Sequence, residues 1–138
     1  MKHPRLRTRS HRQRGQSLVE TALMVLTIFT VVFWIFEVGW LMYTYSVMAN
    51  AANEGVRYAI VHSGGDPSGT EAQVKTFAAT SLHDVSAITV TVSPVDGDYV
   101  PPHQVSVTVT YTYVPWLKGF ITTPPTMSTY SKGAMIVN

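Results

Sequence analysis

The sequence predicts an α+β protein, in which a long N-terminal transmembrane helix precedes a small exported module of one helix and about three antiparallel strands. Residues 21–36 contain no charged residue, as expected of a membrane span. Apolar residues then recur at spacings of three and four up to about residue 61, which is the period of a helix. After residue 86, two segments alternate apolar and polar residues, as half-buried antiparallel strands do.

Charge is distributed unevenly along the chain. The net charge is +2, but six of the ten Lys and Arg residues precede Gln16, and all eight acidic residues follow it. Residues 1–15 are predicted to be a basic leader without regular structure. A basic segment of this size can bind nucleic acid through charge alone. Because this one adjoins an apolar span, we expect no nucleic-acid partner and a cytoplasmic N-terminus with an exported C-terminus.

The long helix is predicted over residues 16–62. Its apolar part runs from Leu18 to about Tyr45, which exceeds the roughly 20 residues that cross a hydrocarbon core. Aromatic residues near its far end are typical of a membrane interface: Trp34, Trp40, Tyr43 and Tyr45. The outer half carries an apolar stripe that must be covered by the rest of the chain: Leu41, Tyr45, Met48, Ala52, Val56 and Ala59.

Residues 63–138 are predicted to form the exported module. A Gly- and Ser-rich run over residues 63–69 ends the long helix, and Ser68 or Thr70 is expected to cap a second helix over Glu71 to about Leu82. The apolar face of that helix is predicted to contain Val74, Phe77, Ala78 and Leu82, and Glu71 precedes Lys75 by four residues. Strands are expected over residues 87–93, 104–114 and 127–137, with a loop rather than a tight hairpin over residues 93–103.

A short motif stands at the start of the apolar run. Gly15 follows the basic leader, and Glu20 lies five positions after it. A glycine and a glutamate at this spacing resemble the prepilin peptidase site of type IV-like pilins, in which the cut falls after the glycine. The resemblance places the cut between Gly15 and Gln16.

Two further stretches of sequence make the resemblance to a family more specific. They are FEVGW at residues 36–40 and EGVRYA at residues 54–59. Together they resemble the TadE-like pseudopilins of tight-adherence pilus systems, in which an acidic residue and a glycine late in the span precede a Glu-Gly-x-Arg-Tyr-Ala pattern. Thr21 departs from the aromatic residue of the major pilins, and the chain is longer than they are, which favours a minor pilin or pseudopilin.

The resemblance implies a structural subunit rather than an enzyme. It implies a single-pass protein of the bacterial cytoplasmic (inner) membrane, which enters a cell-surface pilus, caps it or stays in the envelope. The partners it implies are other pilin or pseudopilin subunits, prepilin peptidase, the inner-membrane pilus assembly platform and the lipid bilayer. It implies no cofactor.

Glu20 is the candidate residue for assembly and register. A glutamate at the centre of a membrane helix costs roughly 2.5–3.5 kcal/mol, so it needs a partner. The resemblance implies a free amine at Gln16 after cleavage, roughly 6 Å along the helix axis from Glu20, which pairs with the carboxylate of the same or a neighbouring subunit. The alternative is a carboxylate that snorkels to the near interface.

The remaining candidate site residues are assigned to interfaces: Glu37, Gly39, Glu54, Gly55, Arg57 and Tyr58. Glu37 is either a solvated carboxylate at the outer membrane boundary or the partner of a basic group on another subunit. Glu54 and Arg57 can form an i,i+3 ion pair, or they hold the helix on its own module with Tyr58 beneath them. Gly55 permits close approach of another backbone.

Catalytic and metal sites are not expected. The chain has no cysteine, and the spacing of His62, His83 and His103 fits no local zinc motif, so surface or loop positions are predicted for them. Ser81, His83 and Asp84 are the residue types of a serine triad, but neighbouring helical positions point apart.

Three other interpretations stay open. One is a secreted binding domain behind a signal peptide cut near residues 49–51, although the apolar run is longer than the 7–15 residues of a typical signal. Another is an uncleaved, membrane-anchored accessory subunit. The third is a membrane-tethered hydrolase that uses Ser81, His83 or Asp84.

Overall fold

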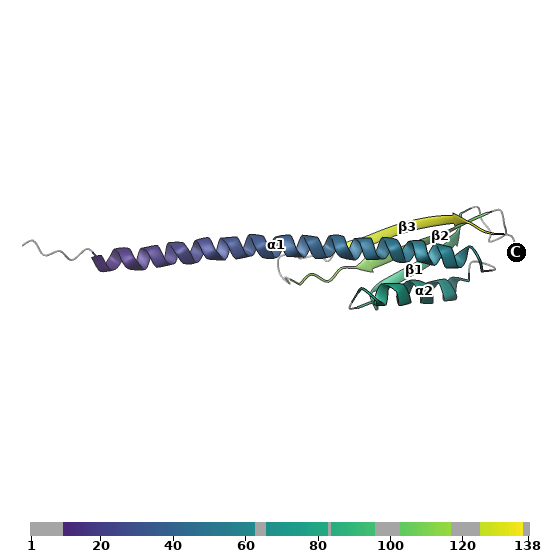
Figure 1. The fold of residues 1–138 in the computed structure, drawn as a ribbon, viewed down its shortest axis with the longest axis horizontal. Helices are drawn as coiled ribbons and strands as arrows, with labels where there is room; N and C mark the ends of the chain where they lie inside the picture. The colour runs from purple at the N-terminus through teal and green to yellow at the C-terminus, as the bar shows by residue number, and fades with distance from the viewer. Residues whose placement is uncertain (1–9, 63–65, 83, 96–102, 117–124, 137–138) are drawn as a thin grey trace, which may run out of the picture. The chain divides into compact units, whose positions relative to one another are not determined.

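A computed structural model describes residues 10–62, 66–82, 84–95, 103–116 and 125–136, with side chains from Gly15 onward. The chain divides into two compact units, Met1–Val38 and Gly39–Asn138. Its elements are α1 (Ser10–Ala59), α2 (Pro67–Ala79), β1 (Ile88–Pro94), β2 (Gln104–Thr112) and β3 (Thr126–Ala134) (Figure 1). This element order confirms the predicted α+β class.

The first unit contains the apolar part of α1. Its side chains are exposed at every position from Gly15 to Phe36. An 18-residue window of α1 has a mean hydropathy of 2.2, so the helix is long and apolar enough to cross a membrane. The hydroxyl groups of Thr21, Thr27 and Thr30 each donate to the carbonyl oxygen four residues earlier, at 2.8–2.9 Å. These bonds satisfy the polar side chains without water, as a lipid environment requires.

The predicted start of the long helix is wrong. The leader was expected to lack regular structure through residue 15, but α1 begins at Ser10. Arg and Gln are good helix formers, and adding a turn to a helix that already exists avoids the cost of nucleation. Residues 1–9 lie outside the described part of the chain.

The second unit has two layers, a three-stranded sheet and the two helices that cover one of its faces. The strand order is β1-β2-β3 and both pairs are antiparallel. Val107 of the central strand lies opposite Val92 of β1 and Ser131 of β3. Side chains alternate along β2, so that Val105, Val107, Val109 and Tyr111 are buried. The opposite face of the sheet is made of Thr and Ser with Tyr130 and Lys132, which suits it to water.

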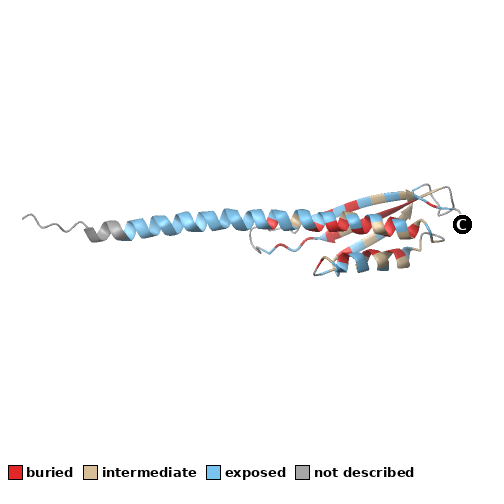
Figure 2. Cartoon of the chain, in the orientation of Figure 1, coloured by how far each residue is buried: buried red, intermediate tan, exposed pale blue. Residues whose placement is uncertain are grey.

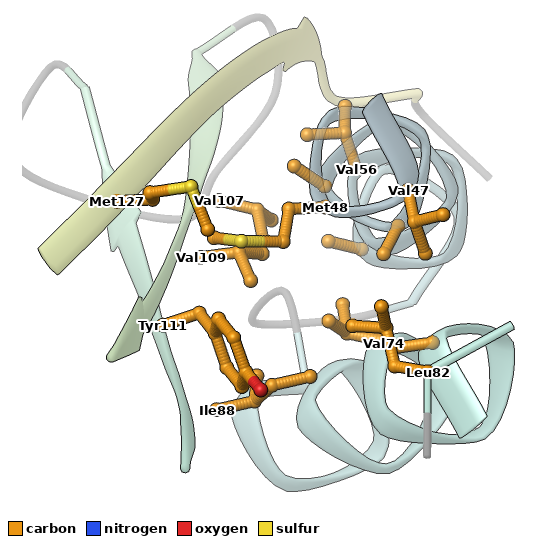
Figure 3. Close-up of a cluster of buried hydrophobic side chains, with 14 of the residues drawn as sticks. Val47, Met48, Val56, Val74, Leu82, Ile88, Val107, Val109, Tyr111 and Met127 are labelled. Atoms are coloured by element: carbon orange, nitrogen blue, oxygen red, sulfur yellow. The ribbon is translucent and has the colours of Figure 1, made fainter. Parts of the chain in front are cut away.

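The core of the second unit joins all of its elements. α1 contributes Val47, Met48, Ala51, Ala52, Val56 and Ala59 to this core. Figure 2 shows buried residues on the second half of α1, on the strands and on α2. Figure 3 shows the side-chain ends of Met48 and Met127 meeting between α1 and β3. Burying a Val or Met side chain is worth about 1.5–3 kcal/mol, so the outer half of α1 is an integral part of this unit.

Several details of the predicted elements differ in the structure. α2 begins at Pro67 with Asp66 as its N-cap, rather than at Glu71 with Ser68 or Thr70 as the cap. Tyr45 and Phe77, which were predicted to lie on apolar faces, are exposed. β2 ends at Thr112 and β3 ends at Ala134, each earlier than predicted. The predicted loop over residues 93–103 lies mostly outside the described residues.

Candidate functional site

The proposed processing and register residues lie on the exposed, apolar part of α1. Gly15, Gln16 and Glu20 are all exposed, and a Cβ atom added at Gly15 would meet nothing within 4 Å. The same part of the helix exposes large apolar side chains in every direction, including Leu23, Leu26, Phe29, Phe33 and Phe36. A helix that is apolar all round is buried in a membrane or among other helices.

Glu37 differs from its neighbours in exposure. Among residues 15–40, whose side chains the structure describes, Glu37 alone is buried, with 8% of its surface exposed. Gly39, two residues later, is exposed, and an added Cβ atom there would meet nothing within 4 Å.

Glu54 and Arg57 form the expected i,i+3 ion pair. Arg57 Nη1 lies 3.7 Å from Glu54 Oε2, and the Arg57 side chain is 80% exposed. An exposed pair of this kind contributes at most a few tenths of a kcal/mol. Because Arg57 points into solvent, the alternative in which it holds α1 on the module is wrong. Its guanidinium group is left facing outward, where another subunit can reach it.

Gly55 lies where α1 meets the rest of the second unit. A Cβ atom added there would lie 2.5 Å from Cγ2 of Val74 and 3.2 Å from Cγ1 of Val107. Gly55 therefore allows close approach of side chains from α2 and β2, not of another backbone as predicted. This contact uses Gly55 inside the unit, so the residue is not available as an interface with another subunit.

Tyr58 connects the end of α1 to the start of α2. Its hydroxyl group donates to Oδ2 of Asp66 at 3.2 Å, and its ring stacks on that of His62 with 3.8 Å between centroids. Asp66 adopts a left-handed backbone conformation with φ of 34°, which Asp tolerates better than most residues. Its other carboxylate oxygen accepts from the backbone N–H of Gly69 at 3.2 Å. Asp66 is therefore both the N-cap of α2 and the partner of Tyr58.

We expect Asp66 to make the stability of the second unit depend on pH. The backbone N–H of Gly69, together with Ser68 and Tyr58, holds the pKa of Asp66 below its ordinary 3.8. A lowered folded-state pKa gives stability that is present above the unfolded pKa and lost as pH falls through the folded value. In melting curves followed by circular dichroism, the melting temperature of Asp66→Asn should therefore fall less than that of the wild type when the pH is lowered below 3.8.

Asp66→Ala is the matched control for this measurement. It removes the cap as well as the charge, so its melting temperature should fall by a few degrees at neutral pH, whereas that of Asp66→Asn, which keeps a capping oxygen, should fall less. Equal acid sensitivity in Asp66→Asn and the wild type would contradict the assignment.

The other predicted polar residues do not assemble into a catalytic group among the described residues. Oδ1 of Asp84 accepts from the backbone N–H of Ser86 at 2.8 Å. The Ser81 hydroxyl lies 3.4 Å from that of Thr80. His83 lies outside the described part of the chain. Within that part, no group of three His, Asp or Glu side chains could hold a metal ion.

The comparison with protein families finds a match within α1. The family model for TadE-like proteins matches residues 15–57. The chain carries a TadE-like segment. The match begins at Gly15 and ends two residues before the end of α1. No curated protein and no solved structure matches the chain.

The TadE-like segment contains most of the candidate residues: Gly15, Gln16, Glu20, Glu37, Gly39, Glu54, Gly55 and Arg57. Tyr58 follows it directly, and Asp66 lies outside it. The match covers less than a third of the chain and lies wholly within α1. Within the described residues, one helix near the N-terminus is long and apolar enough to span a membrane, which fits a membrane-anchored pilin.

Asp66 was not among the predicted site residues. The run Asp66-Pro67-Ser68 carried a usable signal, because an aspartate directly before a proline is typical of a helix N-cap followed by Pro at the first helical position. The bond to Tyr58 had no such signal, since it depends on how the two helices meet.

Proposed function

We propose that this chain is a TadE-like minor pilin or pseudopilin, an assembly subunit of a tight-adherence pilus or a related secretion system. It is made as a precursor and cut by prepilin peptidase between Gly15 and Gln16. α1 anchors it in the cytoplasmic membrane with the basic leader inside and the module of residues 63–138 outside. From there it joins other pilin subunits at the inner-membrane assembly platform.

One observation carries this proposal. The TadE-like match covers a helix whose side chains are exposed at every position from Gly15 to Phe36. Lipid covers such a surface before assembly, and the helices of neighbouring subunits cover it afterwards. The exposed apolar side chains supply the packing area. The charge of Glu20 favours the axial position at which it meets the amine of Gln16.

The signal-peptide interpretation conflicts with the core of the second unit. A cut near residues 49–51 would remove Val47 and Met48 from this core and would leave Ala52 at the new N-terminus. Losing two buried side chains costs several kcal/mol, comparable to the whole stability of many domains. The Gly15–Gln16 bond, by contrast, lies in the second turn of α1, where helix ends fray and where nothing packs on the glycine.

The mature N-terminus tests the proposal. When the full-length chain is produced together with a prepilin peptidase, intact-mass measurement should find a product that begins at Gln16. Gly15→Ala should lower the processed fraction by about 10-fold or more, because one extra methyl group in a fitted pocket costs about 1–3 kcal/mol.

Gly39→Ala is the matched control, since it makes the same change on the same helix away from the cut. It should be processed like the wild type. A product that begins near Ala52 would support the signal-peptide interpretation. A leader that stays intact beside an active peptidase would support the uncleaved accessory subunit.

A further inference from the structure

β3 runs in the same direction as the part of α1 that belongs to the second unit. The Ser131 hydroxyl donates to Oδ1 of Asn53 at 2.6 Å, and the backbone N–H of Ile136 donates to the carbonyl of Ile60 at 3.1 Å. Residue numbers therefore increase in the same direction along β3 and α1. β2 is antiparallel to β3, so it runs the opposite way and ends toward the beginning of the second unit.

The end of β2 can be placed along α1 from these contacts. The backbone N–H of Tyr113 donates to the carbonyl of Pro125 at 3.1 Å. Pro125 precedes Ser131 by six residues, or about 20 Å of strand. The same distance corresponds to about 13 residues of helix, counted back from Asn53. The segment that follows β2 thus begins near the level of Trp40.

This segment is anchored inward and presents apolar side chains outward. Tyr113 is 1% exposed and Pro115 is buried, whereas Val114 is 54% exposed and Trp116 is 81% exposed. Pro115 also lacks a backbone N–H, which lowers the cost of placing this backbone in a poorly hydrated environment. The alternation fixes the outward direction of Val114 and Trp116.

The helix contributes exposed aromatic rings at the same level. Trp40 and Tyr43 are both exposed, with 5.4 Å between their ring centroids. Trp40 follows the uncharged run of residues 21–36 by four positions. Trp and Tyr rings favour the headgroup level of a bilayer, so the place where α1 leaves the membrane is near Trp40.

We propose that Val114 and Trp116 form a second membrane contact, which inserts into the headgroup region of the leaflet from which α1 emerges. This inference rests on the proposed membrane anchoring of α1. Two contacts, one on the helix and one on the sheet, hold the module at a defined height on the lipid surface before assembly. The module is released from that surface when the subunit leaves the bilayer.

Single-tryptophan variants of the full-length chain test this contact. In the test variant, Trp34→Phe and Trp40→Phe leave Trp116 as the reporter. The protein is reconstituted into vesicles of phosphatidylethanolamine and phosphatidylglycerol, with or without bromine atoms near the top of the acyl chains. Bromine should reduce Trp116 emission by about twofold or more, because an interfacial ring lies within contact distance of it.

Two companion variants make the outcomes distinguishable. One keeps Trp34 alone and reports on the span. The other replaces all three native tryptophans with Phe and carries Tyr130→Trp, at an exposed position of β3 about 17 Å beyond Pro125 along the strand. The inference predicts strong quenching for Trp34, quenching for Trp116 and no quenching for Tyr130→Trp.

Each other pattern contradicts a specific step. If Trp34 is quenched while Trp116 behaves like Tyr130→Trp, the second contact is refuted and the span stands. If Trp34 is not quenched, the membrane anchoring itself fails, and the inference fails with it. Shielding of Trp116 only when other pilin subunits are present would assign these side chains to a protein contact and would likewise overturn the inference.

Discussion

Gly55→Val is expected to destabilise the second unit by about 3 kcal/mol, because it overpacks a closed contact. The first added atom would lie 2.5 Å from Cγ2 of Val74 and 3.2 Å from Cγ1 of Val107. Both valines are fully buried and β-branched, so neither can rotate away. The branched side chain of the variant adds two more methyl groups to this overlap.

Circular dichroism of the full-length protein in detergent can measure this effect. For a unit of this size, 1 kcal/mol corresponds to about 4–8 °C in melting temperature, so a decrease of roughly 12–24 °C is expected. The loss should appear in the strand signal, since β2 packs directly against Gly55. Gly55→Ala should show a smaller decrease, because the intrinsic helix preference of alanine, about 1 kcal/mol, offsets part of the overlap.

Gly39→Val is the control for this experiment. It places the same residue in the same helix, at a position where an added Cβ atom meets nothing within 4 Å. Its melting temperature should stay close to that of the wild type. If the two variants melt alike, the packing of α1 against α2 and β2 is not as described.

The main elements could be predicted because their signals are local. The uncharged run of residues 21–36 and the alternation in β2 each depend on a few neighbouring residues. Helical spacing also identified Met48 and Val56 as core positions. The same spacing did not identify Val47, because α1 buries two adjacent rows of side chains and the prediction followed only one of them. Tyr45 has the spacing of the predicted row, four residues after Leu41 and three before Met48, but the structure leaves it exposed.

The contacts between elements could not be predicted in the same way. The bond between Tyr58 and Asp66 needs the turn after α1 to bring α2 back toward it, and no local pattern specifies that turn. The motif from Gly15 to Glu20 is different, because the proposed recognition by a peptidase needs only a short segment of the sequence. Its spacing is therefore visible in the sequence alone.

Glu20→Gln is expected to have the largest effect on assembly. The proposal pairs the Glu20 carboxylate with the amine that cleavage creates at Gln16, in a setting without water. Removing one partner of a buried ion pair costs about 3–5 kcal/mol, because the other charge is left without compensation. The amount of this chain that co-purifies with other pilin subunits should therefore fall by 100-fold or more, since 1.4 kcal/mol corresponds to about tenfold.

The readout must separate assembly from processing and folding. Glu20 is exposed and the second unit does not include it, so Glu20→Gln should melt like the wild type and should still be cut after Gly15. Glu20→Asp keeps the charge on a shorter side chain, and it should recover a substantial part of the co-purification. If Glu20→Gln co-purifies as well as the wild type, the carboxylate only snorkels to the interface and register is set by apolar packing alone. If Glu20→Gln and Glu20→Asp fail equally, the fit of the side chain, rather than its charge, determines assembly.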